Sequence, residues 1–124
     1  MILSARLGFA LNFLCVLLLT GLTQSCSSPS MDDVMQSIYE EYMHGEILMC
    51  ELDGSTVFVA THNHEDASSE IFDDQGEVIM FCNWAWGGTN VPQACYEFDG
   101  CEAIYRADGY INGEPPVDLY GLGD

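Results

Sequence analysis

The chain has 124 residues and carries 20 Asp and Glu against two Arg and no Lys, which gives a formal net charge of −18. A protein that binds nucleic acid neutralises phosphates with a basic patch, and Arg6 and Arg106 alone cannot form one. The composition therefore excludes a nucleic-acid partner, and the length fits one folded domain.

Residues 1–25 have the features of a secretory signal peptide. Arg6 and the amino terminus provide a short positive segment, and an apolar stretch from Leu7 to Leu22 follows. This stretch is shorter than the roughly 20 residues that span a bilayer as a helix, which favours a signal peptide over a transmembrane helix. We therefore expect the mature protein to begin after residue 25.

The segment after the apolar stretch runs Leu22-Thr23-Gln24-Ser25-Cys26 and continues with small polar residues. It resembles the cleavage site of a bacterial lipoprotein precursor, although Thr23 and Gln24 depart from the usual lipobox. The resemblance implies that Cys26 is acylated and that residues 26–30 form a lipidated tether. Because Ser27 and not Asp follows the cysteine, it also implies the outer membrane or cell surface of a Gram-negative bacterium. The alternative is a plain cleaved signal with Cys26 free or paired.

Residues 31–124 are expected to form a single small α+β domain that begins with a helix. Apolar residues recur at helical spacing from Met31 to Met43, which places them on one face, and the opposite face is acidic. Ser30 and Asp33 predict a capped helix start, and Gly45 predicts its end. We expect the apolar face to pack on a sheet.

A β-meander is predicted after the helix. The dipeptide Asp53-Gly54 predicts a tight turn between strands at Glu46–Leu52 and Ser55–Thr61. A polar loop follows from His62 to Ser69, and a second hairpin joins 70–72 to 77–83. The apolar run Val78–Phe81 suggests a strand at the centre of the sheet, with both faces covered. A last short strand is expected at 103–106, and the C-terminal part is expected to be irregular, with the tail from Pro115 to Asp124 a loop.

The turn Phe72-Asp73-Asp74-Gln75-Gly76, followed by Cys82 and Gly87-Gly88, is similar to that of small uncharacterised bacterial lipoproteins that contain a cysteine-bearing β-meander. This resemblance implies an envelope protein and brings no activity with it.

Four cysteines remain in the expected domain, at positions 50, 82, 95 and 101. An even number in an exported domain predicts two disulfides. Of the three connectivities we favour Cys95–Cys101, which closes a short loop, and Cys50–Cys82, which joins the first and last strands of the meander. A four-cysteine zinc site is the alternative, but the chain contains no Cys-x-x-Cys pair.

Two segments could bind a metal ion. His62, His64 and Asp66 alternate along the chain and offer imidazole and carboxylate ligands for zinc or another transition metal. Asp73, Asp74 and Glu77 surround the second turn with oxygens suited to calcium, without the EF-hand pattern. Both segments also fit ordinary polar surface, which we favour.

Trp84 and Trp86 lie two residues apart before a pair of glycines. In an extended segment both rings would project on one face and could stack on a sugar or hold a peptide. The alternative is that they are part of the core, which is more common for tryptophan in a small domain.

The sequence contains no recognisable catalytic motif. It lacks Gly-x-Ser-x-Gly, His-Glu-x-x-His and any lysine, and only pairs of carboxylates, as in glycoside hydrolases, remain open. We therefore expect a non-catalytic lipoprotein that acts as a binding or structural envelope module, with a cationic protein or a glycan as partner. The alternative is a metal-binding envelope protein that uses calcium or zinc.

Overall fold

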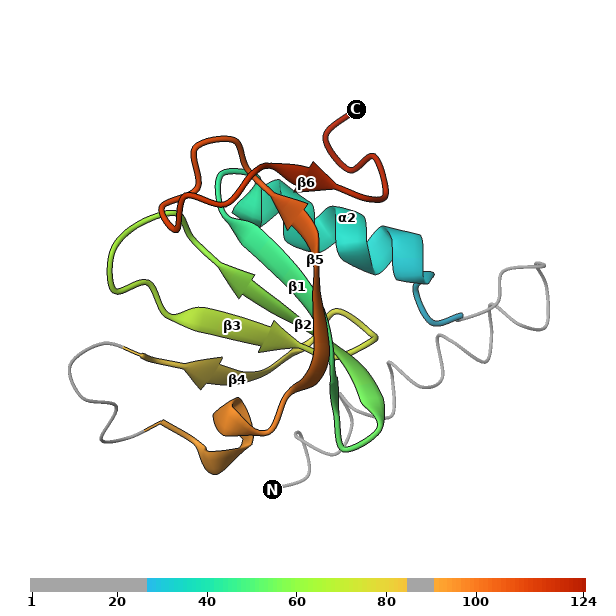
Figure 1. Cartoon of the computed structure of the whole chain (residues 1–124). Helices are drawn as coiled ribbons and strands as arrows, with labels where there is room; N and C mark the ends of the chain where they lie inside the picture. Colours follow the sequence, from blue (N-terminus) through green and yellow to red (C-terminus); the bar gives the residue numbers. More distant parts are fainter. Residues whose placement is uncertain (1–26, 85–90) are drawn as a thin grey trace, which may run out of the picture.

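The computed structural model describes residues 27–84 and 91–124, which form one helix packed on an antiparallel sheet (Figure 1). The predicted α+β fold is confirmed. Along the chain the elements are helix α2 (Met31–Tyr42), strands β1 (Glu46–Leu52), β2 (Ser55–Thr61), β3 (Ser69–Phe72) and β4 (Val78–Cys82), the 3-10 helix η2 (Gln93–Tyr96), and strands β5 (Asp99–Arg106) and β6 (Val117–Asp118).

Helix α2 begins where its sequence predicts. The backbone N–H of Asp33 donates to Ser30 Oγ, and the Asp33 carboxylate accepts from the Ser30 N–H, which completes a capping box. The apolar face is buried against β1 and β2, and its buried residues are Val34, Met35, Ile38 and Tyr42. The predicted packing of this face on a sheet is therefore confirmed.

Gly45 connects the helix to β1 at a point where two segments of backbone almost touch. A Cβ atom at this position would collide with the carbonyl oxygen of Thr61. The Gly45 N–H donates to the Tyr42 carbonyl, and its own carbonyl accepts from Ala107. A side chain here would push β1 away from the end of β2, so this glycine is required by close approach rather than by its φ angle.

The first hairpin is also confirmed. Asp53 and Gly54 both adopt positive φ, 52° and 79°, as a type I′ turn requires, and Leu52 faces Ser55 across it. The second turn is closed by Asp73, whose backbone N–H donates to the Glu77 carbonyl at 2.9 Å.

The order of strands in the sheet is β4-β3-β2-β1-β5-β6. Strands β1 to β4 form the predicted meander, and the chain then returns so that β5 pairs with the free side of β1. The prediction that Val78–Phe81 lies at the sheet centre is wrong: β4 is an edge strand, and Val78, Ile79 and Phe81 are exposed. The error arises because an apolar run has the same sequence pattern in a central and in an edge strand.

The four cysteines form two disulfides, as predicted, but the favoured pairing is wrong. The bonds are Cys50–Cys101 and Cys82–Cys95. Cys101 lies on β5, which pairs with β1 and so places it 4.1 Å from Cys50 between Cα atoms. Helix η2 carries Cys95 to the end of β4. These bonds indicate an oxidising compartment outside the cytoplasm.

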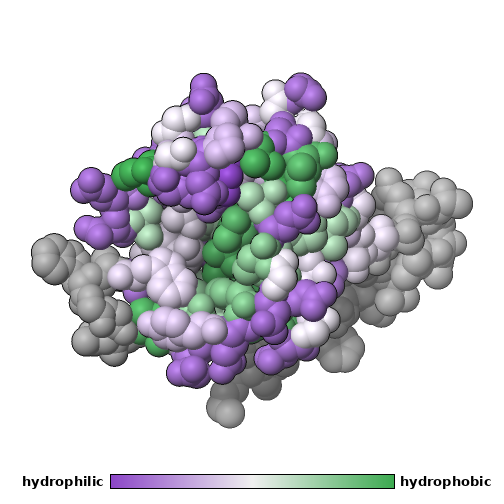
Figure 2. Space-filling view, in the orientation of Figure 1, coloured by the Kyte–Doolittle hydropathy of each residue, from purple (hydrophilic) through white to green (hydrophobic). Residues whose placement is uncertain are grey.

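The two faces of the sheet are covered differently. Helix α2 covers one face, where Ile47, Phe58 and Ile104 are fully buried. A smaller apolar cluster lies on the other face. It includes Cys50 of β1, Cys82 of β4, Ile71 of β3 and Cys95 of η2. On the face seen in Figure 2, apolar residues gather over the central strands and hydrophilic residues surround them.

The C-terminal part is more regular than predicted. Strand β5 covers eight residues, whereas the sequence predicts a short strand at 103–106, and the tail includes β6. The Asp118 carboxylate then accepts the backbone N–H groups of Leu122 and Gly123, which holds the last turn of the chain against the sheet. The tail from Pro115 to Asp124 is therefore fixed by side-chain hydrogen bonds.

Candidate functional site

A cluster of exposed apolar side chains lies along the β4 edge of the sheet. Nine large hydrophobic side chains are exposed in the described part of the chain. Three of them lie on β4, a fourth follows β4 by two residues, and a fifth lies on η2, which the Cys82–Cys95 bond joins to the end of β4. We call these five the β4 edge patch: Val78, Ile79, Phe81, Trp84 and Tyr96. The concentration at one edge matters because single exposed apolar residues are ordinary, whereas a group of them at one place marks an interaction surface.

The strand geometry explains why the β4 side chains are exposed. Met80 and Cys82 point to the face of the small apolar cluster, so Ile79 and Phe81 point to the opposite face. Helix α2 covers that face mainly over β1 and β2, its Tyr42 ring reaches Phe72 of β3, and β4 lies one strand further out than β3. Phe81 is accordingly 59% exposed.

Trp84 and Tyr96 extend the patch beyond the end of β4. Their rings meet edge to face with centroids 5.7 Å apart, and Trp84 Nε1 donates to Ser69 Oγ at 3.2 Å. Tyr96 is positioned by its neighbour Cys95, which is bonded to Cys82 at the end of β4. The Trp84 side chain is therefore held by Ser69 and Tyr96 and remains 42% exposed. Trp86, the other predicted ligand-binding residue, lies outside the described residues.

Carboxylates surround the patch. Glu70 on β3 faces Phe81 across the strand pair, and exposed Asp74 and Glu77 lie in and after the turn that leads into β4. The Asp73 carboxylate has a structural role, because its Oδ1 accepts the backbone N–H groups of Gln75 and Glu77, both at 2.9 Å. The predicted calcium ligands thus lie close in sequence, but the Asp73 carboxylate already accepts backbone hydrogen bonds that close the turn.

The predicted transition-metal residues lie in an exposed loop. Strand β2 ends at Thr61, so His62, His64 and Asp66 lie in the loop that follows it. The His62 and His64 rings are nevertheless nearly parallel, with centroids 6.3 Å apart. The His62 ring stacks on Tyr42 with centroids 4.3 Å apart, and the His64 Nδ1 lies 2.9 Å from the Glu65 carbonyl oxygen. Residues 27–84 and 91–124 contain no group of three or more His, Cys, Asp or Glu placed to hold a metal ion.

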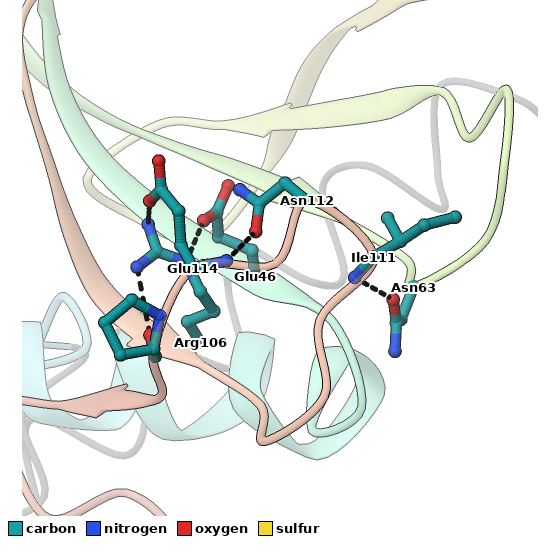
Figure 3. Close-up of polar contacts among 7 residues, drawn as sticks. Glu46, Asn63, Arg106, Ile111, Asn112 and Glu114 are labelled. Atoms are coloured by element: carbon teal, nitrogen blue, oxygen red, sulfur yellow. Dashed lines mark hydrogen bonds and ion pairs between the residues drawn. The ribbon is translucent and has the colours of Figure 1, made fainter.

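Arg106 joins three parts of the chain (Figure 3). Its Nε donates to Glu46 Oε2 at 2.6 Å, a terminal nitrogen lies 2.7 Å from Glu114 Oε2, and the other donates to the Pro115 carbonyl. A depression of about 330 Å³ beside it is lined by Tyr39, Tyr105, Asp118 and the C-terminal residues, among others. Because two carboxylates already bind the guanidinium, the depression offers no free positive charge to an anion.

Burial perturbs three tyrosines. The pKa of the Tyr42 hydroxyl lies well above its usual range. Burial is the largest cause, and a hydrogen bond with Glu70 is the next. Burial also raises the pKa of Tyr105 and of Tyr110. These groups lie in or near the main core and not in the β4 edge patch, so their shifts reflect packing rather than chemistry at the patch.

Cys26, the predicted lipidation site, lies outside the described residues. Within the described ranges no helix has the length and apolar character needed to cross a membrane. Comparisons with protein-family models, with curated proteins and with solved structures found no match to this chain.

Sequence reasoning identified Trp84 but missed the four other members of the β4 edge patch. The sequence pattern predicts that the run from Val78 to Phe81 lies at the centre of the sheet with both faces covered. A usable signal is present, because in the described part of the chain the next strand after β4 begins only at Asp99. A strand without a sequential partner on its far side is a candidate edge.

Proposed function

We propose that the protein is a non-catalytic, lipid-anchored envelope protein of a Gram-negative bacterium whose domain binds a partner protein through the β4 edge patch. The observation that carries the proposal is the exposure of Val78, Ile79 and Phe81 on an edge strand. Soluble domains normally protect such edges with charge, proline or cover, because a bare apolar edge promotes aggregation. The exposed apolar edge of β4 therefore supports a surface that binds a partner.

The charge of the domain supports a cationic partner. All 20 carboxylates lie after residue 31, and Arg106 is the basic residue that accompanies them. Arg106 itself is paired with Glu46 and Glu114. A positively charged partner is therefore attracted over long range and a negatively charged one is repelled.

The lipid anchor is tested at Cys26. In a Gram-negative host grown with labelled palmitate, the wild-type protein is expected to take up label and to sediment with the outer membrane. The Cys26→Ser variant should lose the label and leave the membrane, because one acylated cysteine is the proposed attachment. Label retained by the variant, or none in the wild type, contradicts lipidation at this residue.

The binding surface is tested by photocrosslinking in native cells. A photoreactive amino acid is placed at Phe81 and, as a matched control, at Leu119, which is 54% exposed and follows strand β6 at the opposite edge. We expect a discrete adduct from position 81 and none from position 119. The adduct should be degraded by proteinase, which marks the partner as a protein. Equal adducts at both positions, no adduct at 81, or an adduct that only glycosidases degrade would overturn the proposal.

A further inference from the structure

We propose that the partner contributes an extended, Lys- or Arg-bearing segment that pairs with β4 as a seventh strand of the sheet. This inference rests on the proposed function and adds the mode of binding and the chemistry of the ligand. Strand addition supplies affinity through main-chain hydrogen bonds and selectivity through alternate side chains.

The two edges of the sheet differ in how they are protected. Strand β6 has two residues, is preceded by Pro115 and Pro116, and ends on Asp118, whose carboxylate binds the folded tail. Strand β4 has five residues, Val78-Ile79-Met80-Phe81-Cys82, without a charge or a proline. Short length, proline and charge are the features that prevent strand addition at an edge. Among the described residues the sheet therefore has one blocked edge, at β6, and one open edge, at β4.

The outer side of β4 has no strand partner among the residues that the structure describes. On its inner side β4 pairs with β3. The paired residues run from Ser69 opposite Cys82 to Phe72 opposite Val78. Alternate residues of an edge strand direct their N–H and C=O groups outward, so an extended peptide can complete the ladder.

The side chains around this edge favour apolar residues on both faces of the incoming strand. Ile79 and Phe81 lie on one face, and Met80 with the Trp84 and Tyr96 rings lies on the other. An added strand would place its alternating side chains against both groups. The disulfide Cys82–Cys95 fixes the end of β4, with Cys95 Sγ 3.9 Å from Met80 Sδ, so the edge is held in position before binding.

The carboxylates select the charge of the incoming strand. Glu70 faces Phe81 across the β3–β4 pair, and Asp74 and Glu77 stand exposed at the start of β4. A second copy of this chain would bring the same carboxylates to the edge and would be repelled. A segment with lysine or arginine among its apolar residues meets both the apolar surface and the acidic surroundings.

The test uses the oxidised full-length protein in a neutral detergent and three synthetic peptides of about ten residues. The first has Val and Thr at its central positions, so that both faces are apolar, and Lys near its two ends. The second has the same charge but two central prolines, and the third carries Glu in place of Lys. Amide hydrogen exchange is followed at Val78–Cys82, with Val117–Asp118 of β6 as the internal control. The basic peptide is expected to slow exchange in β4 by about tenfold or more and to leave β6 unchanged.

The proline and glutamate peptides are expected to give no protection, since one cannot pair continuously and the other is repelled. Equal protection by the basic and proline peptides, or no protection of β4 by the basic peptide, would overturn strand addition. Protection of β4 in the protein alone that rises with its concentration would identify a second copy as the occupant and also overturn it. The crosslink at Phe81 is independent of binding mode: its presence without peptide protection rejects strand addition alone, whereas its absence rejects the proposed function.

Discussion

Arg106 holds together parts of the chain that are far apart in sequence. It is 8% exposed and pairs with the nearly buried Glu46 and the exposed Glu114. Removing the guanidinium would leave the Glu46 carboxylate buried without its partner, which costs more than the loss of an exposed ion pair.

Arg106→Met is expected to lower the free energy of unfolding by about 3 kcal/mol or more. Glu114→Gln, which removes only the exposed carboxylate, should cost less than about 1 kcal/mol. Urea unfolding at neutral pH measures both values. Equal losses in the two variants would contradict the assignment of Glu46 as the main partner.

Tyr42 makes stability fall at alkaline pH. The pKa of its hydroxyl is raised in the folded protein, so above about pH 10 an unfolded tyrosine releases a proton that folded Tyr42 retains. The unfolded state is then favoured as pH rises, and stability declines above that pH. Tyr42→Phe should show a shallower decline of the urea midpoint there than the wild type, with Tyr120→Phe, at an exposed ring, as control. An unchanged slope in Tyr42→Phe would contradict this account.

At the scale of elements, local signals were sufficient for α2 and the first hairpin. Ser30, Asp33 and Asp53-Gly54 act on their immediate neighbours, so their effect can be read from the sequence. The place of β4 and the disulfide pairing depend on which strands meet in space. The return of β5 to the free side of β1 brings Cys101 to Cys50 and leaves β4 at an edge, and no local pattern specifies that return.

The two disulfides are expected to be reduced in a fixed order. Cys101 is exposed, whereas Cys82 and Cys95 are both buried. Because a thiolate must reach a sulfur atom to exchange with it, a mild reductant under native conditions should open Cys50–Cys101 first. Timed alkylation and peptide mass mapping measure the order. Earlier or simultaneous reduction of Cys82–Cys95 would show that the end of β4 opens more readily than its burial implies.

At the scale of the whole molecule, the acidic charge opposes folding. Twenty carboxylates repel one another with Arg106 as their basic counterpart after residue 30, and salt screens such repulsion. Sodium chloride raised from about 10 mM to about 0.5 M should therefore increase the Tm by several degrees. Calcium at fixed ionic strength should add no saturable stabilisation; a saturating rise would reveal a specific site and support the metal-binding alternative.

The candidate site also belongs to this scale, because it exists only where the sheet ends. Trp84 was recognisable as a tryptophan near glycines, but Phe81 and Tyr96 join it through the strand order and the Cys82–Cys95 bond. Hydrophobic sequence alone predicts burial, and only the position of β4 at the edge converts the run Val78–Phe81 into a surface.

The most direct measurement of the central claim is the affinity of the basic peptide for the full-length wild type, Phe81→Ser and Leu119→Ser at low and high salt. The account predicts that Phe81→Ser weakens binding about tenfold or more, that Leu119→Ser leaves it unchanged, and that salt weakens it for the wild type. Equal affinities for the two variants, or binding insensitive to salt, would contradict recognition of a cationic strand at the β4 edge.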